Sequence, residues 1–394
     1  MRVVFFTECY HPTVNGVVVS VATYAEQLRQ LGVRVAMIAP ATPGYVDREP
    51  AIYRLPSRRS KSQPTYPIAM PFGHLVRPIL EKERPELIHT HSPFVMGFSA
   101  ALWARRLAVP LVFTFHTIYE KYAHHIPVVP QPIVRVFARK YSRAFANRAQ
   151  CVIAPSEGIS WMLKRQGVRT RIEVLPTGIN LAMAENLEPI RGELGLPQQA
   201  RVLLYAGRIS KEKNLETLLQ AFTVVAGQEP QAHLVVAGDG PGLGALRRLA
   251  RQLGLEERAH FPGMIARRDV FRWAAESETF VFPSLTDTQG LVVAEAMAAG
   301  APCVAVNSLA VMGVVREGEN GLLARNSPES VARALLRVLR DGDLRRTMSA
   351  GARQTAAQFS EQAGGKRLAA IYADLIEHHL RRRDAAPSIA RTAA

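Results

Sequence analysis

Short apolar runs alternate with helical patterns along the chain, and this alternation restricts the fold to an α/β architecture. In the first half, the apolar runs stand at residues 3–6, 33–38, 87–89, 111–115, 152–154 and 172–175. Strands that are separated by helices of ten or more residues form βαβ units, which build a parallel sheet. The alternation then starts again, with runs at residues 201–205, 233–237, 280–282 and 303–306. The sequence therefore predicts two doubly wound, Rossmann-like domains.

The length of the chain agrees with this division, because 394 residues exceed what one hydrophobic core usually organises. We predict a first domain over residues 1–178 and a second over residues 179–360. Residues 361–394 add a long helical pattern followed by a small, polar stretch that is typical of a frayed chain end. Ligands of open parallel sheets bind beyond the carboxyl ends of the strands, so we expect the functional loops to face a cleft between the two sheets.

The cysteines and the apolar segments favour a protein of the cytoplasm. Cys9, Cys151 and Cys303 are odd in number and far apart, which is unlike a disulfide framework or a zinc site. The apolar run at residues 3–6 is too short for a signal peptide. Residues 296–315 carry no charge, but Gly, Pro and Asn interrupt them in the pattern of a helix end, a strand and a loop. We therefore predict no membrane-spanning helix.

The positive charge of the chain is concentrated in its first half. The net charge is +16, and residues 51–150 hold 15 Lys and Arg against 4 Asp and Glu, whereas residues 201–394 hold 25 against 20. A basic region of this kind attracts phosphate groups of nucleic acids, anionic lipids or nucleotides, and the charge alone does not choose between them.

Residues 283–300 combine a strand end, a turn and a helix start with two acidic side chains. Gly290 opens the helix, whose first turn has unpaired N–H groups that can receive a phosphate. Asp287 precedes the helix and Glu295 lies more than one turn inside it, so the two carboxylates could reach the hydroxyl groups of two different sugars. The alternative is that Asp287 caps the helix and Glu295 is a solvated side chain.

Two cations follow the first predicted strand of the second domain. Arg208 stands at the strand end, and Lys213 stands just before the next helix. Arg can bind a diphosphate through two parallel hydrogen bonds and Lys as a point charge, which would stabilise a leaving group as its negative charge develops. The alternative is two ordinary exposed loop cations.

The loops of the first domain offer a glycine, two histidines and two tyrosines. Gly16 lies between a strand and a helix, where it lets the backbone approach a phosphate closely. His91 and His116 each follow a strand, and Tyr119 and Tyr122 come shortly after His116. An ordinary turn and purely structural histidines are the alternatives.

A helical pattern at residues 133–148 is both apolar and strongly basic. Ile133, Phe137, Tyr141 and Phe145 form one stripe, and Arg135, Arg139 and Arg143 form another that is roughly opposite. Lys140, Arg148 and the loop at residues 58–61 enlarge the basic face. Such a face gains about 1 kcal/mol per cation near an anionic lipid surface, although a packed helix with a solvated outer side is the alternative.

Taken together, these motifs resemble the retaining glycosyltransferases of family 4, which have the two-domain GT-B fold. The resemblance rests on the acid-x7-acid segment from Asp287 to Glu295, the Gly-Arg-x4-Lys run that ends at Lys213, and the twin α/β domains. It extends to residues 237–241, 261–263 and 316–321. In the family a C-terminal helix crosses back to the first domain, which is the role expected for residues 361–379.

The resemblance implies a role for each candidate residue. Arg208 and Lys213 would bind the donor diphosphate, Glu295 the ribose and Asp287 the transferred sugar, although the family mostly has Glu at that first acid and an apolar residue at Gln289. The remaining donor contacts would come from Gly16, Gly290 and Leu291. The acceptor side would comprise His91, His116, Tyr119 and Tyr122. His91 would act at the reacting centre together with Asp287, Arg208 and Lys213.

The resemblance also implies transfer with retention of configuration and without a metal ion. The only Asp-x-Asp sequence, at residues 341–343, joins two helical patterns and is interpreted as a turn. We expect no cofactor other than the nucleotide sugar, which is a co-substrate.

The acceptor is suggested by short sequences within the motifs. His-Thr-x-Tyr-Glu-x-Tyr at residues 116–122 and Thr-Asp-Thr-Gln-Gly at residues 286–290 resemble the subset that glucosylates diacylglycerol from UDP-glucose. We therefore expect a peripheral enzyme on the inner face of the membrane, bound to anionic lipid through its basic first domain. A GDP-mannose-dependent mannosyltransferase acting on a glycolipid is one alternative. A basic nucleic-acid-binding or scaffolding protein is another, but neither aromatic-interleaved basic strands nor a recognition helix is evident, so we expect no nucleic acid partner.

Overall fold

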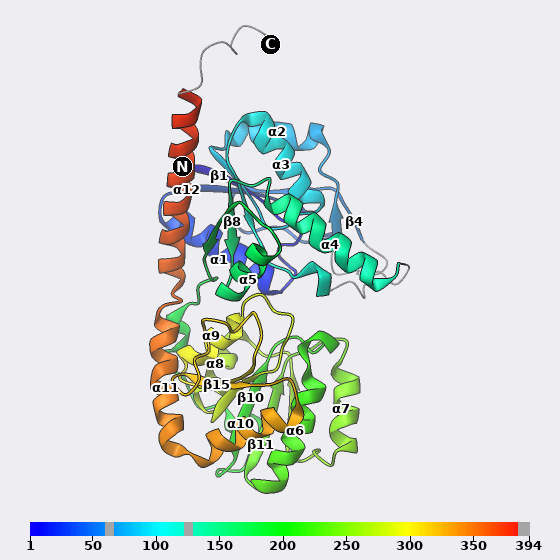
Figure 1. Ribbon diagram of the computed structural model, residues 1–394, viewed down its shortest axis with the longest axis vertical. Helices are drawn as coiled ribbons and strands as arrows, with labels where there is room; N and C mark the ends of the chain where they lie inside the picture. Colours follow the sequence, from blue (N-terminus) through cyan, green and yellow to red (C-terminus); the bar gives the residue numbers. More distant parts are fainter. Residues whose placement is uncertain (60–66, 122–128, 385–394) are drawn as a thin grey trace. The chain divides into compact units, whose positions relative to one another are not determined.

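The structure is a computed structural model, and it describes residues 1–59, 67–121 and 129–384 (Figure 1). The chain divides into two compact units. The first comprises Met1–Pro155, Ile159–Gly178 and the segment from Glu361 onward, and the second comprises Ser156–Gly158 and Ile179–Ser360. Each unit contains its own parallel sheet, which is the α/β fold class that the alternation of apolar runs predicts.

The first unit is built on a seven-stranded sheet in the order β3-β2-β1-β6-β7-β8-β9, and all its strands are parallel. The strands are β1 (Arg2–Phe6), β2 (Arg34–Pro40), β3 (Ile52–Leu55), β6 (Leu87–Thr90), β7 (Leu111–Thr114), β8 (Cys151–Ala154) and β9 (Arg171–Val174). β6, β7 and β8 are buried along their whole length, as expected for central strands that helices cover on both faces.

The helices of the first unit connect these strands. They are α1 (Gly16–Gln30), α2 (Gly73–Glu83), α3 (Val95–Leu107), α4 (Gln131–Ala146), α5 (Glu157–Arg165) and α12 (Glu361–Asp384). A separate hairpin pairs β4 (Ser57–Arg59) with β5 (Pro67–Ala69) in antiparallel fashion. The apolar runs do not predict β3, because this edge strand is only half-buried and contains Arg54.

The second unit has a six-stranded parallel sheet in the order β12-β11-β10-β13-β14-β15. Its strands are β10 (Arg201–Ala206), β11 (Ala232–Ala237), β12 (Ala259–Gly263), β13 (Thr279–Phe282), β14 (Cys303–Val306) and β15 (Gly321–Ala324). Its helices are α6 (Leu215–Gln228), α7 (Leu243–Gln252), α8 (Arg267–Ala275), α9 (Leu291–Ala298), α10 (Pro328–Arg340) and α11 (Gly342–Ala357), with short 3-10 turns at η2 (Leu181–Ala184), η3 (Arg191–Leu194) and η4 (Lys211–Lys213). Two apolar clusters fill the core of this unit.

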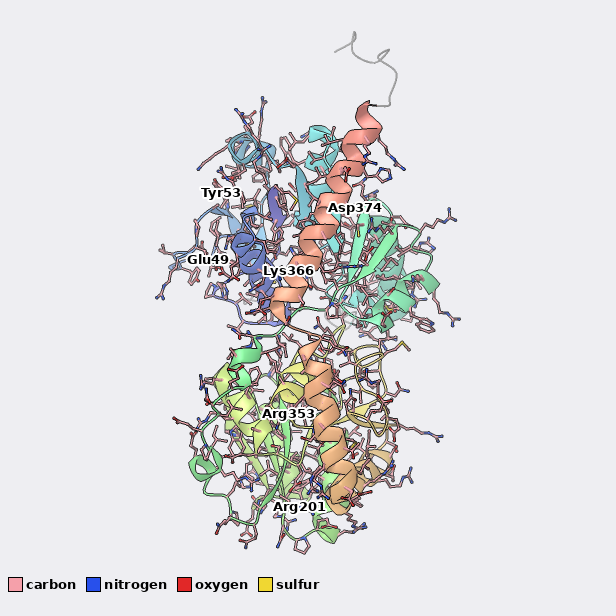
Figure 2. The ribbon with its side chains drawn as sticks, turned by 90° about the vertical axis from the view of Figure 1, so that its left-hand side faces the viewer. Glu49, Tyr53, Arg201, Arg353, Lys366 and Asp374 are labelled. Carbon is pink, nitrogen blue, oxygen red and sulfur yellow. The ribbon has the colours of Figure 1, made fainter. Side chains whose placement is uncertain are left out.

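Helix α12 belongs to the first unit although it ends the chain, and Figure 2 shows it with Lys366 and Asp374 labelled. It packs against α1 so closely that a Cβ on Gly365 would lie 2.5 Å from the Cβ of Gln27. Asp374 pairs with Arg171, and the Tyr372 side chain is fully buried in the core of the unit. Among the described residues, no helix is both long and apolar enough to cross a membrane.

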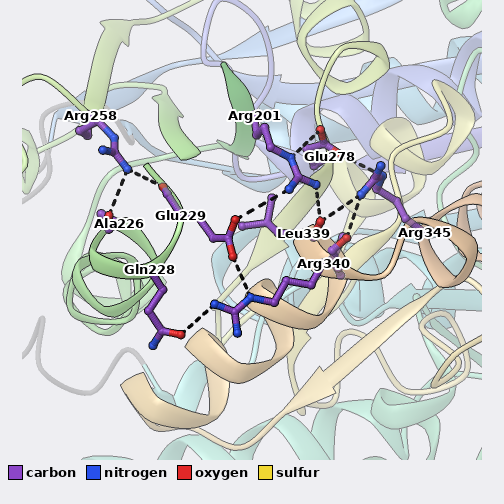
Figure 3. Close-up of polar contacts among 10 residues, drawn as sticks. Arg201, Ala226, Gln228, Glu229, Arg258, Glu278, Leu339, Arg340 and Arg345 are labelled. Atoms are coloured by element: carbon purple, nitrogen blue, oxygen red, sulfur yellow. Dashed lines mark hydrogen bonds and ion pairs between the residues drawn. The ribbon is translucent and has the colours of Figure 1, made fainter. Parts of the chain in front are cut away.

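An ion-pair network covers the edge of the second unit at which β10 begins (Figure 3). Arg201, the first residue of β10, has its Nε 3.3 Å from Glu278 Oε1, and Arg345 Nε lies 2.8 Å from the other oxygen of Glu278. Arg340 Nε lies 2.7 Å from Glu229 Oε1. These cations are neutralised by neighbouring carboxylates, so we assign this edge a structural role. Ligand-binding groups are expected at the other edge, at the carboxyl ends of the strands.

Both sheets reverse their strand order beside the first strand of the unit. In the first unit the reversal lies between β1 and β6, and in the second it lies between β10 and β13. The loops that leave neighbouring strands in opposite directions open a crevice at such a point, where α/β proteins bind their ligands. The loops after these four strands carry most of the candidate residues.

Candidate functional site

Lys213 and Asp287 meet across the reversal point of the second unit. Lys213 ends η4 in the loop after β10, and Asp287 lies in the loop after β13. The Lys213 Nζ is 2.6 Å from Asp287 Oδ1, and both side chains are largely buried. The carboxylate therefore holds the ammonium group in place at the crevice, where a charge-assisted hydrogen bond is stronger than one in open solvent.

Two glycines allow the loops beside this pair to touch through their backbones. Gly207 follows β10 with φ 150°, and Gly238 follows β11 with φ 141°. A Cβ on Gly238 would lie 1.8 Å from the carbonyl oxygen of Gly207, so no other residue fits there without moving the loop. The close contact fixes the start of the segment that carries Arg208 and Lys213.

Arg208 lies in the same loop but is exposed. Its backbone carbonyl accepts a hydrogen bond of 2.9 Å from the hydroxyl of the buried Tyr205, which anchors the main chain of this exposed residue. The structure thus holds the backbone of Arg208 in the crevice loop.

Helix α9 begins at the same reversal point, directly after Gly290. The N-cap residue Gly290 makes no side-chain capping bond, and the first turn contains no acidic residue. Leu291 is the first residue of the helix, and its side chain packs partly against the core. A helix start of this kind presents backbone N–H groups and a partial positive charge, which are the features that bind phosphate.

Glu295 lies inside α9 and is paired with an arginine that the sequence analysis did not single out. Its side chain is buried, with a residue exposure of 6%. Arg267, the first residue of α8, approaches Glu295 Oε1 with Nε at 2.7 Å and Nη2 at 2.6 Å. Burial raises the pKa of Glu295, and the positive charge of Arg267 opposes that rise. The interpretation of Glu295 as a solvated side chain is therefore wrong.

In the first unit, Gly16 opens α1 in the loop after β1. Asn15 caps the helix, because its Oδ1 accepts a 2.9 Å hydrogen bond from Val18 N. Apart from the adjoining residues and the backbone of α1 itself, no atom of the described residues lies within 4 Å of the position that a Cβ on Gly16 would take, and the residue is exposed. The backbone at this helix start is thus open to close approach by a ligand.

Three histidine rings form a stack beside the reversal point of the first unit. His89 lies in β6, His91 follows it, and His116 follows β7. The ring centroids of His89 and His91 are 4.2 Å apart, and those of His91 and His116 are 5.2 Å apart. His91 Nδ1 lies 2.9 Å from His116 Nε2. The structure therefore brings His91 and His116 together as a hydrogen-bonded pair.

The stack is anchored by hydroxyl groups and stays neutral. The Tyr372 hydroxyl of α12 lies 2.5 Å from His89 Nδ1, and the Thr114 hydroxyl lies 2.7 Å from His89 Nε2. Burial lowers the pKa of His116 to about 3, and it holds the pKa values of His89 and His91 well below the ordinary 6.5. His91 Nε2 is buried and has no hydrogen-bond partner among the described residues. This nitrogen is therefore available for a hydrogen bond to a group other than those residues.

This neutral stack predicts that acid destabilises the first unit. An unfolded histidine titrates near pH 6.5, whereas these three stay unprotonated in the folded state, so the unfolded chain binds more protons below that pH. The free energy of unfolding should fall as the pH drops below about 6.5, with up to about 1.4 kcal/mol per pH unit from each histidine. Urea unfolding at pH 7.5, 6.5 and 5.5 measures this slope. His89→Gln should reduce it, and the exposed His378→Gln should not; an equal slope in all three proteins would contradict the assignment.

Tyr119 lies three residues after His116, whereas Tyr122 lies outside the described residues. Tyr119 stands after β7, and burial raises its pKa. Its ring meets Phe94 edge-on, with centroids 4.7 Å apart. Glu8, the second residue after β1, accepts a 3.2 Å hydrogen bond from Met96 N at the start of α3, and burial raises the pKa of this carboxyl. Glu8 is a second crevice residue to which the sequence analysis gave no role.

Helix α4 is the basic helix expected at residues 133–148, and its apolar stripe is only half packed. Phe145 is buried and Tyr141 is partly covered, but Ile133 is 60% exposed and Phe137 is 66% exposed. The N-terminal half of α4 is therefore not packed, which contradicts the interpretation of this segment as a packed helix. The exposed cations are Arg135, Arg139, Lys140, Arg143 and Arg148, of which Arg139 pairs with Glu120. Arg58 is exposed too, whereas Ser60 and Lys61 lie outside the described residues.

The Asp-x-Asp sequence at residues 341–343 has the structural role expected of it. Asp341 caps α11 by accepting a 2.9 Å hydrogen bond from Leu344 N, and Asp343 pairs with Arg346. In the part of the chain that the structure describes, no group of three or more His, Cys, Asp or Glu side chains is arranged to hold a metal ion.

The sequence matches known families and relatives over almost its whole length. The family described as "Glycosyltransferase Family 4" matches residues 14–183, and "Glycosyl transferases group 1" matches residues 187–355. The chain is 31% identical to an alpha-monoglucosyldiacylglycerol synthase of Streptococcus pneumoniae, over 95% of this chain and 86% of that protein. It is 25% identical to the synthase of the same name from Acholeplasma laidlawii, over 96% and 98%. A D-inositol 3-phosphate glycosyltransferase of Nocardioides sp. is 29% identical over 77% and 68%.

Solved structures resemble this one over the full chain. Sucrose-phosphate synthase from Thermosynechococcus elongatus superposes with a TM-score of 0.80 at 23% identity, covering 96% of this chain and 100% of that one. Anabaena HepE, solved in complex with UDP-glucose, gives a TM-score of 0.76 at 20% identity, covering 95% and 100%. At these identities the likeness concerns the fold alone.

Proposed function

We propose, since this chain belongs to the family 4 glycosyltransferases and has the GT-B fold, that it transfers a hexose from a nucleotide sugar to a hydroxyl group of a membrane lipid. The observation that carries the lipid assignment is the similarity to two alpha-monoglucosyldiacylglycerol synthases over 95% and 96% of this chain. Our specific assignment is UDP-glucose as the donor and 1,2-diacylglycerol as the acceptor.

The second unit would bind the donor. Lys213, which Asp287 holds in the crevice, and Arg208, whose side chain is exposed beside it, would neutralise the diphosphate as it leaves. The N–H groups at the start of α9, from Leu291 onward, would receive a phosphate oxygen. Asp287 would contact the transferred sugar with its second oxygen, and Glu295 would accept hydrogen bonds from the ribose hydroxyls.

The first unit would position the acceptor hydroxyl and complete the reacting centre. His91 is neutral and its Nε2 has no partner among the described residues, so this nitrogen would contact the sugar or the hydroxyl that attacks it. His116 would hold the His91 ring through the 2.9 Å bond, and Tyr119 would border the acceptor. We assign front-face transfer with retention of configuration, in which cationic side chains and helix amides serve in place of a metal ion.

The first unit would also hold the enzyme on the membrane as a peripheral protein of the cytoplasmic face. The cations of α4 are exposed, and the helix contains no acidic residue. Each cation near an anionic surface contributes about 1 kcal/mol, which falls off with ionic strength.

The test is a parallel incubation with UDP-glucose and with GDP-mannose, in vesicles that contain diacylglycerol and anionic phospholipid, followed by mass analysis of the products. We expect a monohexosyl diacylglycerol from UDP-glucose, with an α anomeric linkage by NMR, and the same yield after treatment with EDTA. A product from GDP-mannose alone would establish the mannosyltransferase alternative. Transfer only to inositol 3-phosphate, supplied as a third acceptor, would overturn the lipid assignment.

A further inference from the structure

Large apolar side chains are exposed mainly on one part of the first unit. Among the described residues, 21 such side chains are exposed; 11 of them lie between residues 68 and 137, and only four lie in the whole second unit. Leaving apolar area in water costs about 25 cal/mol per Å² relative to burying it. A concentration of this kind on a folded unit marks a surface that binds another apolar body.

A groove runs through this surface along α3. Phe94, Phe98 and Leu102 are spaced by four residues, so they follow one face of the helix. Tyr141 of α4 and Pro71 border the groove from other segments, and the nearly buried Trp103 contributes to its lining. The groove has a volume of about 420 Å³. From Phe94 to Leu102 it extends about 12 Å, since a helix rises 1.5 Å per residue, which is close to the hydrocarbon depth of one bilayer leaflet, about 15 Å.

One polar group lies within this apolar lining. Ser99 is 4% exposed, and its Oγ has no hydrogen-bond partner among the described residues. A buried hydroxyl without a partner loses free energy that a ligand with an acceptor atom would restore. The groove therefore fits a ligand that is apolar over most of its length and carries a single carbonyl oxygen.

One end of the groove adjoins the residues proposed for the acceptor. Phe94 follows His91 by three positions, and its ring contacts Tyr119 edge-on. The same ring stacks on Tyr141 with centroids 5.7 Å apart and an interplanar angle of 4°. The Tyr141 hydroxyl donates a 2.7 Å hydrogen bond to the carbonyl of Pro93, which fixes this wall. A ligand with its hydroxyl near His91 would thus extend its tail along α3.

The apolar surface continues from the groove onto the basic helix α4. Phe137 stacks on Tyr141 with centroids 6.0 Å apart, and Ile133 is exposed one turn earlier. The same helix exposes Arg135 and Lys140. Exposed apolar side chains among cations are complementary to an anionic lipid surface, and they would not suit an acidic or purely polar partner.

We propose that the groove along α3 binds one ester-linked acyl chain of the lipid acceptor, with Ser99 Oγ donating to the ester carbonyl. The inference rests on the proposed function, because the acceptor must be a lipid with its hydroxyl close to the chain. It adds that the enzyme selects the acceptor by its acyl chain. Phe98 determines this specificity most directly, since its ring lies in the middle of the groove lining and is 58% exposed.

The activity test compares dioleoylglycerol with dibutyrylglycerol in mixed micelles. Phe98→Gln should lower the ratio of kcat/KM for the long-chain over the short-chain acceptor at least tenfold. The matched control is Phe137→Gln, which removes a similarly exposed ring, 66% against 58%, outside the groove lining. This variant should keep the ratio and weaken only the binding to anionic vesicles. An unchanged ratio in Phe98→Gln would overturn the proposal. An equal fall in both variants would also overturn it, because the surface would then be a general membrane contact.

A second readout does not depend on activity. In a Trp161→Phe protein, the remaining tryptophans are Trp103, which lines the groove, and Trp273, which is 2% exposed in the second unit. Micelles with dibrominated diacylglycerol should quench Trp103, whereas dioleoylglycerol should not, and Phe98→Gln should reduce the quenching. Quenching without sugar transfer to any lipid would support acyl-chain binding in the groove and would reject the proposed function. Transfer without quenching, or capture of a protein segment in place of the acyl chain, would reject the groove.

Discussion

Replacing Lys213 with alanine should lower kcat/KM for the nucleotide sugar by about 10²- to 10³-fold, which is about 3–4 kcal/mol of transition-state stabilisation. The ammonium group would no longer offset the charge that develops on the leaving diphosphate. In addition, the Asp287 carboxylate would lose the partner that is now 2.6 Å away, and it would repel the phosphates. Steady-state kinetics with UDP-glucose, together with calorimetric titration of UDP, measure the loss.

Lys211 provides the matched control for this substitution. It lies in the same short 3-10 turn as Lys213, but it is exposed and forms no ion pair among those found in the described residues. Lys211→Ala should change kcat/KM by less than about threefold. Asp287→Asn in the Lys213→Ala background should recover part of the UDP affinity, because it removes the uncompensated carboxylate. Equal losses in Lys211→Ala and Lys213→Ala would show that only the general positive charge matters, and would refute the assigned contact.

Replacing Glu295 with glutamine should abolish the preference of the enzyme for a nucleotide with intact ribose hydroxyls. Hydrogen bonds to a charged group contribute about 1.5–3 kcal/mol, so the wild-type protein should bind UDP about 10- to 100-fold more tightly than 3′-deoxy-UDP. In Glu295→Gln the two ligands should bind within about threefold of each other. Calorimetric titration of both nucleotides into both proteins gives the four dissociation constants for this comparison.

Stability must be measured alongside, because Glu295 also neutralises Arg267. Removing the carboxylate should destabilise the second unit by about 1–2 kcal/mol, less than a fully buried pair would lose, since the Arg267 side chain is 37% exposed. Glu276→Gln is the control, because it removes an ion pair with Arg191 from the same unit. That variant should keep the preference for UDP over 3′-deoxy-UDP. If Glu295→Gln keeps it as well, Glu295 has a structural role and does not contact the ribose.

The sheets could be predicted from local patterns wherever a strand is buried on both faces. β1, β11 and β13 are mostly apolar and are followed by helical segments, so the sequence identifies them without further information. The edge strands β3 and β12 lack this signal. β3 contains Arg54, and β12 ends in Pro and Gly, so neither run is apolar enough to predict a strand. Their backbone pairing comes from the neighbouring strand.

Arg267 could not be predicted as a site residue, because the apolar runs do not predict β12. Candidate residues are recognised after predicted strands, and Arg267 begins the helix that follows β12. Lys213 and Asp287 were both found, because their own strands were predicted. Their direct ion pair, however, depends on the placement of β10 beside β13, and 74 positions separate the two residues in sequence.

The order of the amino acids was enough to establish the α/β class, two parallel sheets and the loops that carry the ligand-binding groups. Those properties depend on apolar periodicity and on Gly and Pro positions, which act over a few residues. The pairing of Glu295 with Arg267, the neutral histidine stack and the uncovered apolar groove on α3 were decided by the tertiary structure. Each depends on which distant side chains share a small volume and on how much water they exclude, and a local pattern contains no information about either.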